Sequence, residues 1–461
     1  MSSFSGYHCE WNLGSPGGWQ YQRMCQGLGK LGWSLLAPHL RLPFEVDFDH
    51  PWLDPVPGFA AMLLRAHRRV NGGAPPFLVL LAEKETLTEV VENARMVEYL
   101  NRQEGVSAAL AAPEHLEMAH GEVILNGRPV SLIYMDFNCD TLVAMGRQTD
   151  IRPVTTAIRQ GRVVNPRGME PVGAKGVFEA ITGSARHLMS ATTLRHTPWT
   201  RLFYARATTG PKGEEIPDLV EWTRRNFSRL ILKPAHGYSG HGIFVGPQTE
   251  KVEEAVEKAL SEGNYIVQEL VPIEWWQELY PVAKGNGVAL EPRQTDFRTF
   301  VTDAGLMGFL GRFGGIPTNV GSGGGTQPLA VLPEGLSRRE ADSRVNRALE
   351  KLPGRLFMEV EEEVAQRATA MGYTYLLGPI PISLKPRLLT PAQLEELRAY
   401  AENLWQDALI LERLWRAGEL DQVVRFGEAE TALARLAPWE GRPALMVSDG
   451  LFNFGSGGGE G

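Results

Sequence analysis

The chain contains 461 residues, of which 43% are hydrophobic and 22% are charged. These values are ordinary for a globular protein and exclude a disordered, collagen-like or coiled-coil chain. The formal net charge is −8 at pH 7. We expect no nucleic-acid partner, because a polyanion binds to basic surfaces.

The three cysteines, Cys9, Cys25 and Cys139, are too few for a disulfide framework and lack the spacing of a zinc site. No basic segment followed by an apolar one opens the sequence, so no signal peptide can be read. No stretch reaches the roughly 18 apolar residues that a membrane-spanning helix needs. We therefore expect a cytoplasmic protein without a membrane partner.

The first 75 residues are rich in Trp, Pro and Gly and predict a short helix and loops, which we assign to a substrate pocket or a lobe interface. From residue 76 the apolar run PFLVLLAE predicts a buried parallel strand, and an amphipathic helix introduced by Thr86 or Thr88 follows it. VSAALAAP predicts a second strand, and Asn126-Gly127 predicts a hairpin turn. Residues 76–160 should therefore form a small α/β lobe.

Residues 161–335 alternate between strand and helix patterns. AKGVFEAITGSARHLMSA and KVEEAVEKALSEG predict helices, whereas RLILKPAH, GIFVG and YIVQELV predict strands. DFRTFVTDAGLMGFLGRFGG alternates like a hairpin that turns at Asp303-Ala304-Gly305. Helical periodicity dominates residues 336–450, and GSGGGEG indicates a flexible tail within residues 451–461.

The segment LILKPAHGYSGHGIFVG carries the first chemical signal. A strand ends near Lys233, and Gly237, Gly240 and Gly242 allow the following loop to fold closely over a ligand. A lysine beside close-packed backbone N–H groups binds phosphate oxygens. The segment is not a Walker loop, because the lysine precedes the glycines and a strand follows them.

Two further motifs follow in a fixed order. NYIVQELVP places Gln268 and Glu269 at the end of an apolar strand, and QTDFRTFV places Asp296 and Arg298 two residues apart on one strand face. This order resembles that of the ATP-grasp superfamily of ligases. The resemblance implies that the lysine and its loop, with Tyr238 and Ser239, hold phosphates, that residues 268–271 (Gln268, Glu269, Leu270 and Val271) face adenine, and that Arg298 stabilises a phosphate or an acyl phosphate.

A narrower resemblance lies in FLGRFGGIPTNVGSGGGTQPLAVL. This segment is similar to that of circularly permuted ATP-grasp proteins related to glutathionylspermidine synthase, and it adds Arg312 and Asn319 to the implied site. VVNPRGMEPVGAKGVFEAI is similar to the segment of those proteins that carries a second nucleotide lysine, here Lys175. The similarity covers residues 76–332 and implies an α/β (α+β) protein, with an ATP-grasp core at 161–335, a preceding α/β lobe and a helical C-terminal part.

A candidate Mg²⁺ site follows the strand LIYMDFN, where Asp136 and Asn138 are two residues apart and so on one face. A carboxylate and an amide oxygen are hard ligands of the kind that Mg²⁺ prefers. This pattern departs from that of the permuted family, which usually has a basic pair followed by acidic residues here.

The resemblance implies an ATP-dependent carbon–nitrogen ligase that uses ATP and Mg²⁺. It would phosphorylate an acceptor and join it to an amine with release of ADP and phosphate. The acceptor that we favour is a carboxylate, which would become an acyl phosphate. The implied partners are small molecules, the amine being an amino acid, a peptide or a polyamine-like compound, and a homo-oligomer is compatible with the sequence. Three alternatives stay open: an enol or other non-carboxylate acceptor, as in mycosporine-type biosynthesis, an inactive ATP-binding scaffold, and a protein-tagging ligase.

For several single residues, a purely structural role also stays open. Lys175 could be a solvated helix lysine, and Arg298 could serve only to pair with Asp296 or Glu269. Asn319 could be a turn residue, because Asn is frequent where φ is positive. His236 and His241 beside the loop need no catalytic role, because the implied chemistry uses no imidazole.

Overall fold

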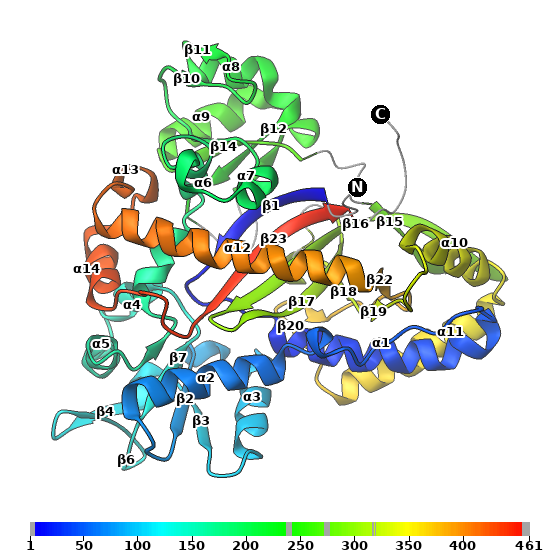
Figure 1. Cartoon of the computed structure of the whole chain (residues 1–461), viewed down its shortest axis with the longest axis horizontal. Helices are drawn as coiled ribbons and strands as arrows, with labels where there is room; N and C mark the ends of the chain where they lie inside the picture. Colours follow the sequence, from blue (N-terminus) through cyan, green and yellow to red (C-terminus); the bar gives the residue numbers. More distant parts are fainter. Residues whose placement is uncertain (1–4, 237–241, 272–276, 316–317, 319, 454–461) are drawn as a thin grey trace.

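The computed structural model describes residues 5–236, 242–271, 277–315, 318 and 320–453 and has a mixed α/β (α+β) fold (Figure 1). Its largest sheet is antiparallel and combines both ends of the chain with its middle. The strands in spatial order are β1 (Ser5–Asn12), β23 (Leu445–Asn453), β16 (Gly287–Thr302), β17 (Gly305–Gly314) and β18 (Gly325–Gln327), and β15 (Gln277–Lys284) pairs with the first half of β16. We call this the central sheet.

The hairpin predicted within the central sheet is confirmed. Thr302 pairs with Gly305, so Asp303 and Ala304 form the turn. Gly305 has φ 92°, a conformation that favours glycine. The Asp303 carboxylate also pairs with Arg65 at 2.7 Å, which ties the turn to the helix α2 (Val56–Asn71).

The second sheet is parallel, and we call it the parallel sheet. Its strands in order are β3 (Ser107–Ala111), β2 (Phe77–Leu81), β7 (Leu132–Met135) and β8 (Val163–Val164). Every residue of β2 is buried, as its continuous apolar run predicted. The helices of this region are α2, α3 (Val91–Asn101), α4 (Cys139–Met145) and α5 (Arg152–Arg159).

A small antiparallel ribbon accompanies the parallel sheet. It consists of β4 (Leu116–Ala119), β5 (Glu122–Leu125) and β6 (Arg128–Pro129). Asn126 and Gly127 both have positive φ, 51° and 75°. The Asn-Gly turn predicted from the sequence is therefore confirmed, because a type I′ turn needs positive φ at both positions.

The third sheet, which we call the lysine sheet, contains Lys233. Its order is β13 (Phe244–Val245), β12 (Leu230–Pro234), β14 (Tyr265–Glu269) and β9 (Thr200–Leu202), all antiparallel, and its helices are α8 (Leu219–Asn226) and α9 (Val252–Glu262). The strand–loop–strand–helix–strand order predicted for this segment is confirmed. In Figure 1 this region lies above the central sheet, and the parallel sheet lies below it.

Helices cover the central sheet. The long helix α12 (Pro391–Arg416) runs across it (Figure 1), and its buried Leu397, Tyr400 and Leu404 join one hydrophobic core with Phe297 and Phe309 of the sheet. The helix begins with a capping box, in which Thr390 and Gln393 satisfy each other's backbone N–H groups.

Further helices and strands complete the described part of the chain. They are α1 (Trp19–Leu40), α6 (Val177–Ile181), α7 (Ala191–His196), α10 (Arg338–Leu349), α11 (Gly354–Ala370), α13 (Asp421–Val424), α14 (Glu428–Leu436), and the strands β10 (Thr208–Thr209), β11 (Glu215–Ile216), β19 (Leu329–Val331), β20 (Thr374–Tyr375), β21 (Gly378–Pro379) and β22 (Arg387–Leu389). No helix in the described part of the chain is both long and apolar enough to cross a membrane.

Several secondary-structure expectations need correction. The first 75 residues hold two long helices, α1 and α2, where we expected one short helix and loops. The helix expected at 174–191 is confined to α6 and a 3₁₀ turn, because Thr182-Gly183-Ser184 interrupts it. Residues 336–453 are not wholly helical, since β23 lies inside the central sheet, and residues 451–453 belong to that strand.

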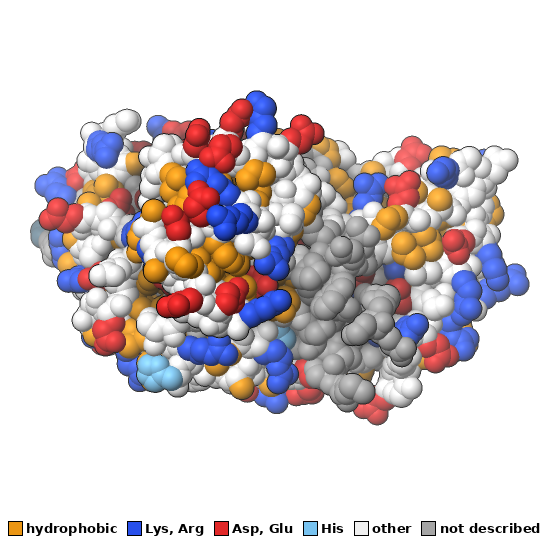
Figure 2. Space-filling view, turned by 90° about the horizontal axis from the view of Figure 1, so that it is seen from above, with side chains coloured by type: hydrophobic (Ala, Val, Ile, Leu, Met, Phe, Trp, Pro, Cys, Tyr) orange, Lys and Arg blue, Asp and Glu red, His pale blue; other side chains and the backbone are white. Residues whose placement is uncertain are grey.

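Surface charge is mixed. Figure 2 shows acidic and basic side chains interspersed over the face that it presents, without a field of one sign. This pattern agrees with a modest net charge of −8 on 461 residues.

Candidate functional site

Lys233 lies in the middle of the lysine sheet. Its residue is 7% exposed, and its Nζ donates a 2.9 Å hydrogen bond to Oε1 of Gln268 on the neighbouring strand. Gln268 in turn donates to Oγ1 of Thr200 at 2.9 Å. Among the described residues no carboxylate lies within ion-pair distance of this ammonium. A buried ammonium held only by a neutral amide is stabilised by an anionic ligand.

Lys175 reaches the same region from another segment. Its backbone N–H donates to the carbonyl of Ala235 at 3.2 Å, so the turn before α6 lies against the end of β12. Its Nζ lies 3.4 Å from Oε2 of Glu10 on β1. The residue precedes α6 instead of lying on a helix, which corrects the expectation of a helix lysine.

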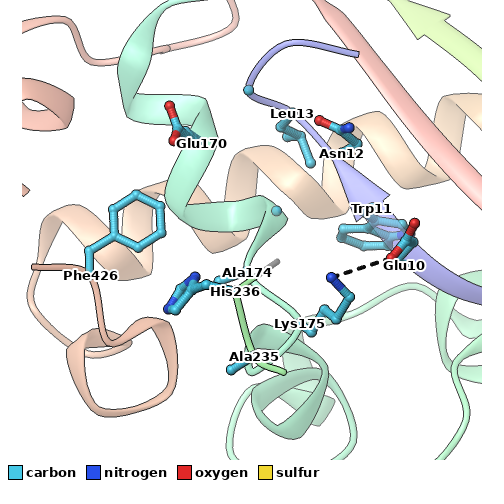
Figure 3. A pocket seen from close by; sticks show the side chains of 12 residues that line it. Glu10, Trp11, Asn12, Leu13, Glu170, Ala174, Lys175, Ala235, His236 and Phe426 are labelled. Atoms are coloured by element: carbon cyan, nitrogen blue, oxygen red, sulfur yellow. Dashed lines mark ion pairs between the residues drawn. The ribbon is translucent and has the colours of Figure 1, made fainter. Parts of the chain in front are cut away.

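A cavity opens beside Lys175 (Figure 3). Its lining joins the end of β1, the turn before α6, and the end of β12, and comprises Glu10, Trp11, Asn12, Leu13, Gly14, Glu170, Gly173, Ala174, Lys175, Ala235, His236 and Phe426. The His236 ring lies against Phe426, with ring centroids 5.2 Å apart. Burial, with Lys175 nearby, lowers the pKa of His236, so its imidazole is neutral at pH 7.

Arg298 and Arg312 form a charged cluster on the central sheet. Arg298 donates to both carboxylate oxygens of Asp449 on β23, at 2.7 and 2.6 Å, and to the carbonyl of Gly17 at 2.6 Å. Arg312 donates to both oxygens of Asp296 at 2.7 Å and also pairs with Asp449 at 3.2 Å. The Arg298 partner is thus neither Asp296 nor Glu269, the two expected from sequence.

Cys9 of β1 is close enough to both the central sheet and the lysine sheet for charges of each to act on it. Burial raises the pKa of the Cys9 thiol to about 11, and the charges that act on it include Lys233 and Asp449, from the two sheets. Asp296 and Glu10 act on it as well. Charged groups from both sheets therefore act on Cys9, which lies on the edge strand of the central sheet.

The adenine-facing residues predicted by the resemblance lie at the end of β14. Gln268 is buried and holds Lys233, and Glu269 is half-buried, with its pKa raised by burial. The backbone N–H of Leu270 donates to the carbonyl of Arg229 at 2.9 Å, and Val271 is buried. This strand end therefore adjoins the lysine that we expect to bind phosphate.

Part of the predicted loop lies outside the described residues, namely Gly237, Tyr238, Ser239, Gly240 and Asn319. Gly242 is described and has φ 72°. A Cβ on it would lie 2.9 Å from the Tyr265 hydroxyl, so both conformation and space call for glycine there.

Asp136 and Asn138 do not share a strand face, because β7 ends at Met135. Asp136 accepts a 2.6 Å hydrogen bond from Asn93, whereas Oδ1 of Asn138 accepts a 3.0 Å bond from Ser15. The two side chains thus have different hydrogen-bond partners, and their role as a pair of metal ligands stays a prediction. Among the described residues no group of three His, Cys, Asp or Glu side chains is placed to hold a metal ion.

Sequence reasoning missed Glu10 and Asp449. Asp449 follows the apolar run Ala444–Val447, which could have been recognised as a strand ending in polar residues. Glu10 lies in a segment whose alternation is interrupted by a register shift between His8 and Glu10, so its pattern carried little signal.

Comparisons with known proteins complete the description. No protein-family model matches the chain, and no curated protein matches it. Among solved structures, a glutathione synthetase-like effector from Globodera pallida, in its apo form, is similar with a TM-score of 0.31 and 13% identity over 59% of this chain and 56% of that one. The chain thus spans little more than half of that protein, and a similarity of this size carries no argument about function.

Proposed function

We propose that the chain is an ATP-dependent ligase of the ATP-grasp type, with the nucleotide between the lysine sheet and the central sheet. The observation that carries this proposal is Lys233, a buried ammonium whose hydrogen-bond partner is a neutral amide. A triphosphate would supply the missing negative charge. Lys175 adds positive charge beside the end of β12, and the arginine cluster adds positive charge on the central sheet.

The proposed reaction has two steps. An acceptor carboxylate oxygen attacks the γ-phosphorus, the bond to the β-phosphate oxygen breaks, and ADP leaves with the electron pair. An amine then attacks the acyl carbon, phosphate leaves, and the amine gives up a proton. Lys175 and Lys233 stabilise the phosphate charge, while Arg298 and Arg312 stabilise the oxyanion of the second step.

Both arginines have N–H groups available to stabilise this oxyanion. Arg312 uses Nε and Nη2 for its carboxylate partners, which leaves Nη1 to bind a ligand. Arg298 is held at three points, so its guanidinium is fixed in place before a substrate arrives. Fixed dipoles and charges stabilise developing charge without reorganising.

Mg²⁺ would be held by Asp296 and Asp449 on the central sheet, each of which keeps one carboxylate lone pair beside its bonds to the arginines and, for Asp296, to Thr318. When bound, the ion would supply positive charge that neutralises the phosphates. The metal role of Asp136 and Asn138 stays a prediction that their separate partners do not favour.

The test of the proposal is Lys233→Met, which keeps the apolar stem and removes the charge. We expect ATP affinity, measured by calorimetry with Mg²⁺, to fall at least 100-fold while the melting temperature stays near that of the wild type. The matched control is Lys251→Ala, an exposed lysine at the start of α9, which should change ATP affinity less than twofold. Nucleotide affinity within twofold of wild type in Lys233→Met would reject the site.

Measurements of enzymatic turnover distinguish the alternative functions. ADP release measured over carboxylates, enols, amino acids and polyamines, with mass spectrometry of the product, identifies the acceptor and the amine. ATP binding without ADP release for any mixture would favour an inactive scaffold. Release that depends on an added protein would favour a tagging ligase.

A further inference from the structure

The cavity beside Lys175 is bordered by a histidine with an unpaired ring nitrogen. His236 follows β12 by two residues and lines the cavity together with Lys175 and Phe426 (Figure 3). Its Nε2 is buried and has no hydrogen-bond partner among the described residues. Buried polar atoms of folded proteins are nearly always hydrogen-bonded, so an unpaired one at the wall of a cavity is best explained by a ligand.

The other nitrogen of His236 determines where this unpaired one points. The backbone carbonyls of Val424 and Arg425, at the end of α13, form hydrogen bonds with the ring. Since Nε2 has no partner, these bonds are made by Nδ1, which carries the proton of the neutral ring. The two ring nitrogens point away from each other, so the lone pair of Nε2 faces away from α13.

Two contacts fix the His236 ring, and its surroundings keep it neutral. Phe426 packs against it edge to face, with centroids 5.2 Å apart, and Nδ1 is held by α13. Burial, and then the charge of Lys175, lower the pKa of His236, although the two carbonyls and Asp140 act in the opposite direction. At pH 7 Nε2 is therefore a fixed acceptor that cannot donate a hydrogen bond.

The same cavity contains the lysine that we assign to phosphate. The Lys175 side chain is 12% exposed, and its Nζ lies 3.4 Å from Oε2 of Glu10. Figure 3 shows this pair on one side of the cavity and His236 with Phe426 on the other. Trp11, which also lines the cavity, has a buried Nε1 without a partner in the described part of the chain. A ligand that fills the cavity would therefore contact both the phosphate lysine and the unpaired acceptor.

We propose that this cavity binds the attacking amine of the ligase, with Nε2 of His236 accepting first its N–H and then its proton. This inference rests on the proposed function, in which the amine loses a proton as the amide forms. The amine nitrogen bonds to the acyl carbon, the bond from that carbon to the phosphate oxygen breaks, and phosphate leaves with the electron pair. The proton passes from the nitrogen to Nε2.

Other occupants fit the cavity less well. A carboxylate or a phosphate would be attracted to Lys175 but carries no proton to donate to Nε2. A metal ion would need further ligands, and among the described residues no group of three His, Cys, Asp or Glu side chains is placed to hold one. From the sequence we expected no catalytic role for His236, and the unpaired Nε2 at the cavity is the observation that gives it one.

Binding of a small amine without nucleotide tests the site. The probe is n-butylamine, with n-butyltrimethylammonium as the match that keeps the charge but has no N–H, and 1-butanol as the neutral donor. Each is titrated at pH 8 and followed through the ¹⁵N resonances of the histidine rings. We expect n-butylamine to shift the Nε2 resonance of His236 and to bind at least about tenfold more tightly than either match.

Two substitutions separate binding from proton transfer. His236→Asn keeps an N–H near the position of Nδ1 but removes Nε2, and should weaken n-butylamine binding at least about tenfold. His236→Gln places an amide oxygen near Nε2, so binding should stay within threefold. Its kcat for amide formation, measured by ADP release, should fall at least about 100-fold, because an amide takes up no proton. The control His39→Asn, at an exposed position of α1, should change neither quantity more than twofold.

Hydroxylamine distinguishes a base from a structural residue. It is unprotonated at pH 7 and needs little help from a base, so His236→Gln should lower its turnover less than threefold. Equal losses of turnover with hydroxylamine and with the alkylamine would show a structural role and reject the proton transfer.

The titration also has defined contrary results. The site is overturned if n-butylamine does not bind to the wild type, binds equally well to His236→Asn, or binds no better than n-butyltrimethylammonium. Equally tight binding of 1-butanol would assign the cavity to a hydroxyl instead. If His236→Asn fails to fold, the comparison of the three probes on the wild type still decides. A wild type that does not bind ATP rejects the ligase and with it the proton transfer, whereas the amine site is judged by the titration alone.

Discussion

Arg298 connects three parts of the chain through one side chain. Its guanidinium holds Asp449 of β23 through two hydrogen bonds and the carbonyl of Gly17 through a third. A lysine carries the same charge but lacks the planar fork that makes paired bonds to a carboxylate. The position of the charge, more than its presence, is therefore what Arg298 contributes.

We predict that Arg298→Lys lowers kcat about 10²–10³-fold, as the loss of a fixed oxyanion donor does, while KM for ATP changes less than threefold. ADP release with the acceptor mixture measures both quantities. Arg293→Lys, at an exposed position of the same strand with Glu291 as its partner, should leave both unchanged. A parallel loss of ATP affinity and melting temperature would instead show a structural role.

At the scale of the element, β23 determines how the central sheet is built. It lies between β1 and β16 and pairs with both along most of its length. Ala444, Leu445, Met446 and Val447 are all fully buried, so the strand contributes to the core on both faces of the sheet. It also places Asp449 between the two arginines.

Met446→Ala should destabilise the protein by about 2–5 kcal/mol, because truncating a buried side chain leaves a cavity. Met358→Ala, on the exposed side of α11 at 48% exposure, should change stability by less than about 0.5 kcal/mol. Urea unfolding followed by tryptophan fluorescence compares the two. Equal stabilities would show that β23 is peripheral to the cooperative core.

At the scale of the whole molecule, a buried charge network joins segments that are far apart in the sequence. Glu278 of β15 pairs with Arg338 of α10, and its carboxylate lies 3.4 Å from Arg387 of β22. Arg387 also donates to the carbonyl oxygens of Asp296 and Phe452, at 3.2 and 3.1 Å. The network therefore connects the outer hairpin and α10 to β16 and β23, two of the three strands that carry the arginine–carboxylate cluster.

Glu278→Gln should cost about 3–5 kcal/mol at pH 7, because it leaves buried arginines without their counter-charge. Burial would raise the pKa of Glu278, but Arg338, Arg387 and Lys385 lower it to about 2. Since the pKa is below that of the unfolded chain, the stabilisation is present above about pH 4.5 and is lost as pH falls towards 2. The difference in the free energy of unfolding between the wild type and Glu278→Gln should therefore become smaller as the pH is lowered.

The control is Glu291→Gln, which removes an exposed partner of Arg293 and should change stability by less than about 1 kcal/mol at any pH. Urea unfolding between pH 3 and pH 7 measures both variants. If the difference in unfolding free energy between the wild type and Glu278→Gln is constant across this range, the assigned role of the Glu278 charge is contradicted.

The sequence by itself determined what depends on neighbours along the chain. The apolar run at Phe77–Leu81, the Asn126-Gly127 turn, and the order of strand, loop, helix and strand around Lys233 were all readable, because period, turn chemistry and helix boundaries are local properties. The strand and glycine-loop pattern identified Lys233 as a candidate, whereas Lys175, Arg298 and Arg312 became candidates through the resemblance to ATP-grasp ligases.

Only the tertiary structure decided which of these residues meet. Arg298 and Asp449 are 151 positions apart, and β1 pairs with β23 across nearly the whole chain. It likewise gave Asp136 and Asn138 different hydrogen-bond partners, Asn93 and Ser15, because β7 ends before both residues. Long-range pairing follows from how buried faces fit in three dimensions, and no periodicity within a short window carries that information.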